Sequence, residues 1–130
     1  MKTVANVAGA LLGFIFVVFG LNYFLRFIPI PPPPEGSPAA MFMGALYSSG
    51  FLAFVKILEI AGGILVAFPR TRPIGLLLLT PIIVNIVAYH IFIARGGLFE
   101  PPVVLSTVAA AFLIWVHRRG VAALIADRAA

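Results

Sequence analysis

Long runs of apolar residues alternate with short polar segments along the whole chain. Four runs stand out, at about 4–28, 51–68, 73–94 and 101–116. Each is close to the roughly 20 apolar residues that a helix needs to cross the hydrocarbon core of a bilayer. The segments between them carry proline, glycine and arginine, which end helices or mark turns. The pattern predicts an all-α integral membrane protein, a four-transmembrane-helix bundle that forms a single membrane domain over residues 1–130.

The longest connection, residues 29–50, has a composition of its own. Four consecutive prolines at 31–34 cannot continue a helix and favour a stiff polyproline II segment, so we expect an external loop. Ser37 followed by Pro38 is typical of a helix start, and the next residues can make about three turns before Gly50. Such a helix is too short to cross a bilayer. We therefore expect a short interfacial or re-entrant helix between the first two spans.

Composition supports the membrane assignment and narrows the chemistry. Hydrophobic residues make up 62% of the chain and charged residues 10%, against about 45–50% and 25% in soluble domains. The absence of cysteine excludes thiolate nucleophiles, disulfide exchange, cysteine-ligated metals and iron–sulfur clusters. The net charge of +5 comes from residues scattered at helix ends rather than clustered in a run. We expect membrane lipid, and no nucleic acid, as a partner.

The distribution of basic residues predicts the orientation. If four helices alternate, six basic residues fall on one side and three on the other. The first group is Lys2, Arg70, Arg72, Arg118, Arg119 and Arg128, and the second is Arg26, Lys56 and Arg95. Positive charge accumulates on the cytoplasmic side of membrane proteins. Both termini are therefore expected in the cytoplasm, and the inner membrane of a bacterium is the expected location.

Polar residues of three predicted spans fall at one depth. With a rise of about 1.5 Å per residue, Glu59 lies roughly 12 Å below the outer end of its helix, Asn22 roughly 9 Å and Asn85 roughly 13 Å. Four more polar residues occupy the same outer third, whereas the inner half of each span is almost entirely apolar. The candidate ligand-binding residues are Glu59, Asn85, His90, Tyr89, Asn22, Lys56 and Arg26.

Glu59 carries the strongest functional signal. A charge within the hydrocarbon region costs a few kcal/mol, so this carboxyl group should face the interior and be paired or protonated. Lys56, three residues away, and Arg26, at the end of the first span, are both candidate partners. Ligand binding or proton handling at Glu59 is the functional interpretation. Helix-to-helix hydrogen bonding is the structural interpretation, and it is favoured for Asn22 and for two residues of the last span, Ser106 and Thr107.

Other chemistries have less support in the sequence. His90 and His117 fall at opposite membrane faces, so they cannot be the two axial ligands of one haem. We expect no metal site. No motif for phosphate binding, zinc hydrolysis or a serine nucleophile occurs, so whether the protein is an enzyme stays open. Gly62 and Gly63, next to Glu59, allow another helix or a flat ligand to approach closely.

Several motifs in order resemble the DoxX family of small four-helix membrane proteins. They are "GLNYFLRF" at the end of the first span, "KILEIAGGILV" in the second, the arginine-bearing turn after it, and "NIVAYHIF" in the third. The resemblance implies that Glu59, Asn85 and His90 line the interior of the bundle. The family takes its name from a membrane subunit associated with electron transfer from thiosulfate to quinone, which implies a redox-associated membrane subunit.

Three functions follow from these observations. The first is a DoxX-like subunit that holds a quinone-like or other lipophilic ligand in the outer half of the bundle, because Glu59, Asn85, Tyr89 and His90 supply hydrogen bonds beside flat apolar walls. The second is a structural accessory subunit of a larger membrane complex, which would have other membrane subunits as partners. The third, a transporter or proton channel, would need a water path through an apolar inner half.

Overall fold

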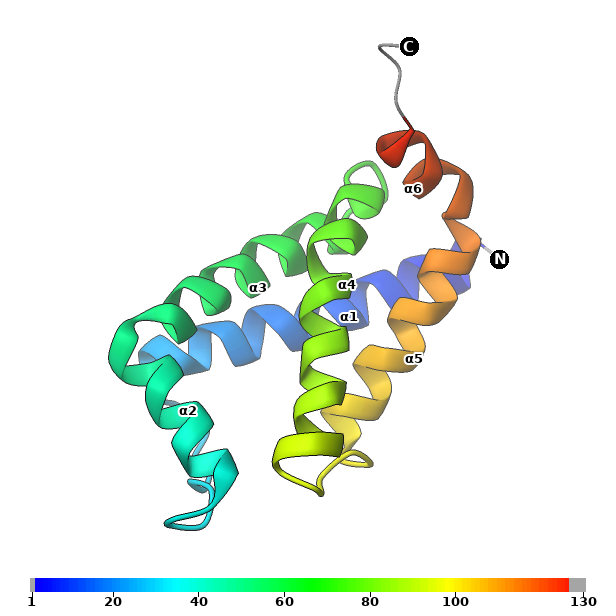
Figure 1. Cartoon of the computed structure of the whole chain (residues 1–130). Coiled ribbons are helices and arrows are strands. Elements are labelled where there is room, and N and C mark those ends of the chain that lie inside the picture. The colour runs from blue at the N-terminus through cyan, green and yellow to red at the C-terminus, as the bar shows by residue number, and fades with distance from the viewer. Residues whose placement is uncertain (1, 127–130) are drawn as a thin grey trace.

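The computed structural model describes residues 2–126, and all of its regular structure is helical. Figure 1 shows the elements in chain order, and over the described residues no strand occurs. Their bounds are α1 Lys2–Leu25, α2 Pro38–Ser49, α3 Phe51–Ala67, α4 Arg72–Ala88, the π-helical turn η1 Tyr89–Ile93, α5 Pro101–Val116 and α6 Arg118–Ile125. Asp127 and Arg128, which entered the charge count above, lie outside the described residues.

The apolar helices have the lengths expected of an integral membrane protein. The 24 residues of α1 and the 22 residues from Arg72 to Ile93 are each long and apolar enough to cross a bilayer. Two further candidates arise if α2 with α3, which meet at 83°, and α5 with α6, which meet at 78°, each count as one bent span. The protein thus has two to four candidate spans, and the complete four-span arrangement stays a prediction.

The first span ends earlier than the apolar pattern indicates. Residues 4–28 were expected to be helical, but α1 ends at Leu25 because Arg26 turns into the left-handed region with φ 54°. The side chain of Asn22 then forms hydrogen bonds with the backbone that follows the helix. Its Nδ2 donates to the Ile28 carbonyl at 3.0 Å, and its Oδ1 accepts from the Ile28 amide at 2.7 Å. Asn22 is buried and closes the end of this helix.

The short helix expected within residues 29–50 is present, and its start is confirmed in detail. The Ser37 hydroxyl accepts from the Ala40 amide at 3.2 Å, and Pro38 occupies the first helical turn. Gly50 ends α2 in the left-handed conformation, φ 82°, which glycine adopts without steric cost. α3 begins at the next residue, so one glycine forms the sharp elbow between the two helices.

The third predicted run, 73–94, begins at Arg72 and changes its helix type near the end. α4 continues past Pro81 to Ala88, and the next five residues form η1, in which the amide of Ala94 bonds to the carbonyl of Tyr89. A π turn holds one more residue than an α turn and shifts the side chains that follow. The last predicted span, 101–116, coincides with α5.

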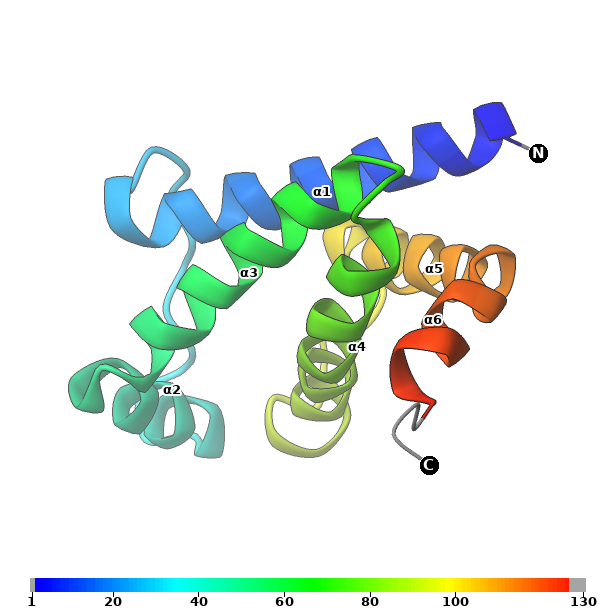
Figure 2. The same cartoon turned by 90° about the horizontal axis from the view of Figure 1, so that it is seen from above.

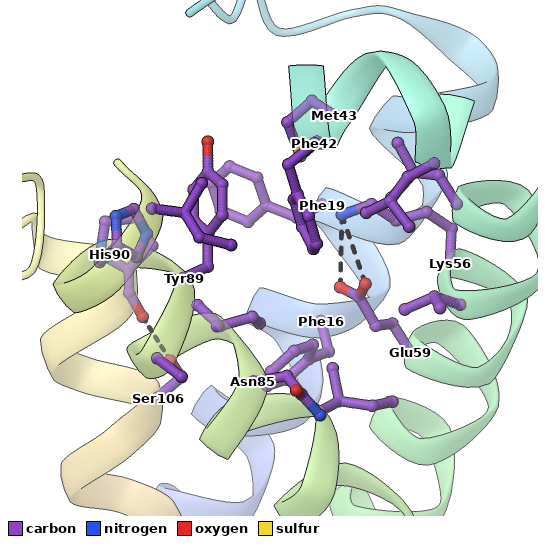
Figure 3. A pocket seen from close by; sticks show the side chains of 18 of the residues that line it. Phe16, Phe19, Phe42, Met43, Lys56, Glu59, Asn85, Tyr89, His90 and Ser106 are labelled. Carbon is purple, nitrogen blue, oxygen red and sulfur yellow. Dashed lines mark hydrogen bonds and ion pairs between the residues drawn. The ribbon is translucent and has the colours of Figure 1, made fainter. Parts of the chain in front are cut away.

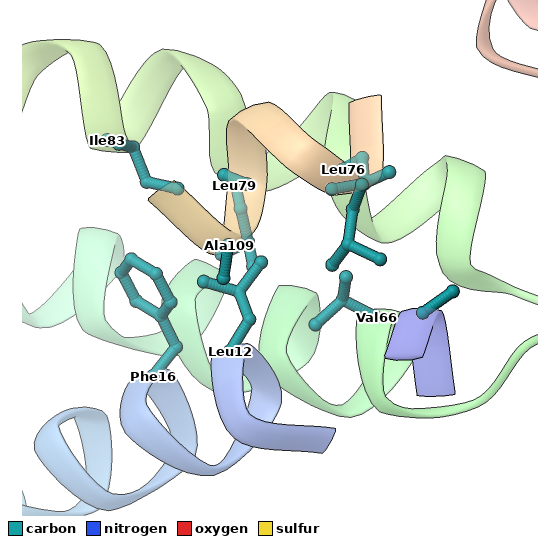
Figure 4. Packing of buried hydrophobic residues seen from close by; sticks show 10 residues of the cluster. Leu12, Phe16, Val66, Leu76, Leu79, Ile83 and Ala109 are labelled. Carbon is teal, nitrogen blue, oxygen red and sulfur yellow. The ribbon is translucent and has the colours of Figure 1, made fainter. Parts of the chain in front are cut away.

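Close contact between α1 and α3 organises the core. The two helices lie side by side in both orthogonal views (Figures 1 and 2), and glycines stand where they touch. A Cβ atom added to Gly13 would lie 2.5 Å from the Gly63 carbonyl oxygen, and one on Gly75 of α4 would lie 2.6 Å from the Val66 nitrogen. The buried cluster between α1, α3, α4 and α5 (Figure 4) includes Leu12, Phe16, Val66, Leu76, Leu79, Ile83, Ala109 and Leu113.

Large apolar side chains also cover the outside of the molecule. Phe14, Phe54, Val84 and Val108, from four different helices, are each more than half exposed. An exposed apolar surface of this extent is unfavourable in water and is what the hydrocarbon of a bilayer solvates. The distribution agrees with the membrane assignment made from composition.

Candidate ligand-binding site

A cavity of about 660 Å³ opens between α1, α2, α3, α5 and the α4–η1 segment. Most of its wall is apolar or aromatic, with Phe16 and Phe19 from α1 and Phe42 from α2. Five of the seven candidate residues line it: Lys56, Glu59, Asn85, Tyr89 and His90. Figure 3 shows Lys56 and Glu59 on one side of this space and Tyr89 and His90 on the other.

Lys56 and Glu59 form an ion pair on one wall of the cavity. The Lys56 Nζ lies 3.4 Å from both carboxylate oxygens of Glu59. The two residues are one turn apart on α3, which places their side chains on the same face. The side chain of Glu59 is 5% exposed and that of Lys56 is 22% exposed, so the carboxylate sits deeper and the ammonium group lies nearer to the surface. Of the two partners left open by the sequence, the structure selects Lys56.

Arg26 and Asn22 lie outside the cavity, and their interactions explain why. Arg26 Nη2 donates to the Tyr47 hydroxyl at 2.9 Å, which ties the end of α1 to α2. The side-chain amide of Asn22 forms both of its hydrogen bonds with the backbone of Ile28. Both side chains therefore position the C-terminal end of α1 and contribute nothing to the lining.

The opposite wall comes from α4 and η1. In a regular α-helix, Asn85 and His90 would be separated by about 140° around the axis, yet both line the cavity, which extends from α4 along η1. Asn85 Nδ2 donates to the Pro81 carbonyl at 2.9 Å. His90 Nδ1 lies 2.9 Å from the Gly96 carbonyl oxygen. Because a carbonyl oxygen only accepts, Nδ1 is the donor.

Aromatic contacts hold this wall against α2. The rings of Phe42 and Tyr89 have centroids 5.6 Å apart, and those of Tyr89 and His90 are 5.2 Å apart in an edge-to-face arrangement. These separations lie within the range at which aromatic pairs stabilise one another. α2 thus forms one wall of the cavity, although it is too short to span the membrane.

Ser106 and Thr107 bond to their own helix. The Ser106 hydroxyl donates to the Pro102 carbonyl at 2.6 Å, and the Thr107 hydroxyl donates to the Val103 carbonyl at 2.7 Å. Of the two, Ser106 lines the cavity. The expected hydrogen bonds between helices therefore do not form here. Each hydroxyl instead donates to a backbone carbonyl one turn earlier in α5, as Ser and Thr often do inside helices.

Sequence reasoning missed a second polar cluster at the opposite end of the molecule. Arg72 was counted as a cytoplasmic surface charge, but it is 1% exposed. Its Nε donates to the Val66 carbonyl at 2.7 Å, Nη2 to the Ala67 carbonyl at 3.0 Å, and Nη1 to the Asn6 side chain at 3.2 Å. We call Arg72 with these three acceptors the arginine clamp. It caps the C-terminal end of α3, where the helix dipole favours a cation.

Gly9 makes room for the clamp. A Cβ atom at this position of α1 would clash with the guanidinium group of Arg72. Nothing in the local pattern "PRTRP" separates the buried Arg72 from the exposed Arg70. The signal that could have found it is a glycine on a distant helix, which becomes informative only when the helix pairing is known.

Metal ligation has no support within the described residues. No group of three or more His, Asp and Glu side chains in residues 2–126 lies close enough to hold a metal ion. The polar residues of the cavity can donate and accept hydrogen bonds and exchange protons, and the rings beside them can stack on a flat apolar molecule.

Comparison with known proteins identifies no relative of this chain. A scan against protein-family models, a search of curated proteins and a search of solved structures each find no significant match for this chain. The resemblance to the DoxX family therefore stays a prediction that rests on the motifs described above.

Proposed function

We propose that this protein is a DoxX-like, redox-associated membrane subunit that binds a quinone-like lipophilic ligand in the cavity between its helices. The observation that carries the proposal is the Lys56–Glu59 ion pair at the wall of an otherwise aromatic and aliphatic cavity of about 660 Å³. Pockets that hold small ligands range over about 300–1,000 Å³ and combine apolar walls with a few polar groups. The cavity has both properties.

The residues around the cavity match the chemistry of a quinone headgroup. Its carbonyl oxygens accept hydrogen bonds, and the ammonium of Lys56 and the hydroxyl of Tyr89 are donors among the lining side chains. Its ring is flat, as are Phe16, Phe19 and Phe42. Glu59, paired with Lys56, is the group that would exchange a proton with the reduced ligand. The ligand would enter from the bilayer, because the outer surface of the helices is apolar.

The proposed arrangement in the membrane follows from the charges. Four spans with both termini in the cytoplasm would place the cavity in the outer half of a bacterial inner membrane. Partners drawn from the same membrane, either lipid or other subunits, are then expected.

The test compares Glu59→Gln with wild type in mild detergent. A short-chain ubiquinone analogue is titrated, and the quinones that co-purify are measured by mass spectrometry. Loss of a charge-assisted hydrogen-bond network costs about 1.5–3 kcal/mol, so the Kd should rise about tenfold or more. Gln keeps the size of the side chain, so the cavity keeps its shape.

Glu100→Gln is the matched control, since Glu100 is an exposed carboxylate outside the cavity. It should bind the analogue as wild type does. Equal affinity in wild type and Glu59→Gln would overturn the proposal, as would no binding to wild type. Partner subunits that co-purify equally with both variants, without any quinone, would point instead to a structural accessory subunit.

A further inference from the structure

The C-terminal helix α6 turns sharply away from α5 and presents an apolar edge that the protein leaves uncovered. The two helices meet at 78°, so α6 lies across the end of the molecule rather than along α5. Val121 packs against the core, and Gly120 lies beside Pro73 of α4. Leu124 and Ile125 are 48% and 68% exposed. A short helix that is anchored near its middle and exposes apolar side chains in its last turn is suited to the boundary between headgroups and acyl chains.

The same end of the molecule carries exposed basic residues from three separate segments. Figure 1 shows the start of α1, the α3–α4 turn and α6 on one side of the fold. They contribute four exposed cations, which we call the basic end: Lys2, Arg70, Arg118 and Arg119. Within residues 2–126 there are three carboxylates: Glu35 and Glu100 lie in loops at the other end, and Glu59 lies midway along α3. Over the described residues, no negative side chain offsets the basic end.

Trp115 marks the depth of this surface. Its side chain is 58% exposed, the guanidinium carbon of Arg118 lies 4.7 Å from the centre of its ring, and Arg118 Nη1 donates to its backbone carbonyl at 2.7 Å. Tryptophan is enriched at the level of lipid headgroups. A tryptophan, an arginine held over it and an apolar helix edge therefore meet at one interface.

We propose that the basic end binds the anionic phospholipid headgroups of its leaflet. Leu124 and Ile125, in the last turn of α6, insert between acyl chains, while Arg118 and Arg119, in its first turn, contact lipid phosphates. Phosphate suits this surface because guanidinium groups bind it in bidentate fashion. The proposal does not depend on the cavity, which opens at the other end of the fold.

Trp115 supplies the test, because it is the single tryptophan of the chain. The full-length protein is placed in nanodiscs of phosphatidylcholine with a minor fraction of phosphatidylglycerol, and bromine is carried on the acyl chains of one lipid at a time. Quenching of Trp115 then reports which lipid lies beside it. Each basic residue near the surface favours anionic lipid by about fivefold, so brominated phosphatidylglycerol should quench at least fivefold more than its mole fraction predicts, and 1 M salt should reduce the excess.

Two double variants make the result specific. Arg118→Gln with Arg119→Gln should bring the quenching down to the mole fraction. Arg26→Gln with Arg95→Gln removes the same charge from the opposite end and should keep the excess. Quenching is expressed as the ratio between the two lipids within each variant, which cancels any change in the fluorescence of Trp115 itself. Equal quenching by both lipids in wild type, or an excess that persists in the first double variant, would overturn the proposal.

Discussion

Two ionisable side chains are buried in different parts of the molecule, and they are satisfied in opposite ways. Glu59 pairs with Lys56 beside an open cavity. Arg72, at the end of the molecule away from the cavity, donates to two helix-end carbonyls and to Asn6, with Gly9 packed against it. Over the described residues, no carboxylate pairs with Arg72. One charge faces unfilled space, and the other is enclosed.

This difference predicts which of the two sites matters for stability and which for the proposed ligand binding. A charge enclosed by well-aligned acceptors stabilises the helices that supply them, since removing it leaves buried polar groups without partners. A charged pair at a cavity wall contributes little net stability, because desolvation offsets the attraction. The arginine clamp should therefore govern folding, and the ion pair should govern ligand binding. Three measurements test this contrast.

The largest effect is expected at the arginine clamp. Arg72→Met retains the length of the side chain but removes the donors to Val66, Ala67 and Asn6. Asn6 is exposed, but the carbonyls of Val66 and Ala67 each lose a partner at a cost of about 1–3 kcal/mol, so the free energy of unfolding in detergent should fall by about 2–6 kcal/mol. Equilibrium unfolding in mixed micelles would measure it. Arg70→Met, two residues away and exposed, should change stability by less than about 0.5 kcal/mol.

A second, smaller effect is expected at the ion pair. Lys56→Met and Glu59→Leu should each destabilise the protein, because each leaves its partner charged in an apolar wall. The double variant should recover most of the loss, with a coupling energy of about 2 kcal/mol between the two sites. Its stability should approach that of wild type while quinone binding stays lost. Additive losses in the double variant would show that the two residues act independently.

The sequence predicted the polar residues of the cavity better than the arginine clamp, and the reason is physical. Lys56 and Glu59 are three residues apart on one helix, so helical geometry alone brings them together. Asn85 and His90 line the same cavity because other helices surround α4 and η1, and no local pattern indicates that packing. The arginine clamp depends on the packing of α1 against α3 and α4, which joins residues such as Asn6 and Arg72 that are far apart in the sequence.

The helix boundaries show the same pattern: those set by adjacent residues were predicted, and those set by residues farther apart were not. The cap at Ser37 and the turn at Gly50 were predicted because the residues that form them are adjacent in the sequence. The predicted end of α1 is three residues too late. The hydrogen bonds between the Asn22 side chain and the backbone of Ile28 accompany the end of the helix, and the apolar pattern does not indicate them. The end of α5 at Val116 was predicted because the apolar run stops there, but the 78° angle between α5 and α6 has no marker in the hydrophobic pattern.

The smallest predicted effect concerns His117, which lies between α5 and α6 close to the arginine clamp. Its Nε2 is buried and has no hydrogen-bond partner within residues 2–126. Burial, and secondarily the positive charge of Arg72, lower the pKa of His117 from its ordinary value of 6.5. The folded protein therefore binds this proton less readily than the unfolded chain does, so stability is fully present above about pH 6.5 and declines as the pH falls toward the folded pKa.

Thermal unfolding between pH 7.5 and 5 would measure the dependence on His117. The chain has two histidines, so each can be removed while the other is retained. His117→Leu should flatten the pH dependence, whereas His90→Gln should preserve it. If His90→Gln flattens it instead, the pH sensitivity belongs to the cavity end. The contrast would then be reversed, because the enclosed end would be insensitive to protonation and the proposed binding site would carry the titrating group.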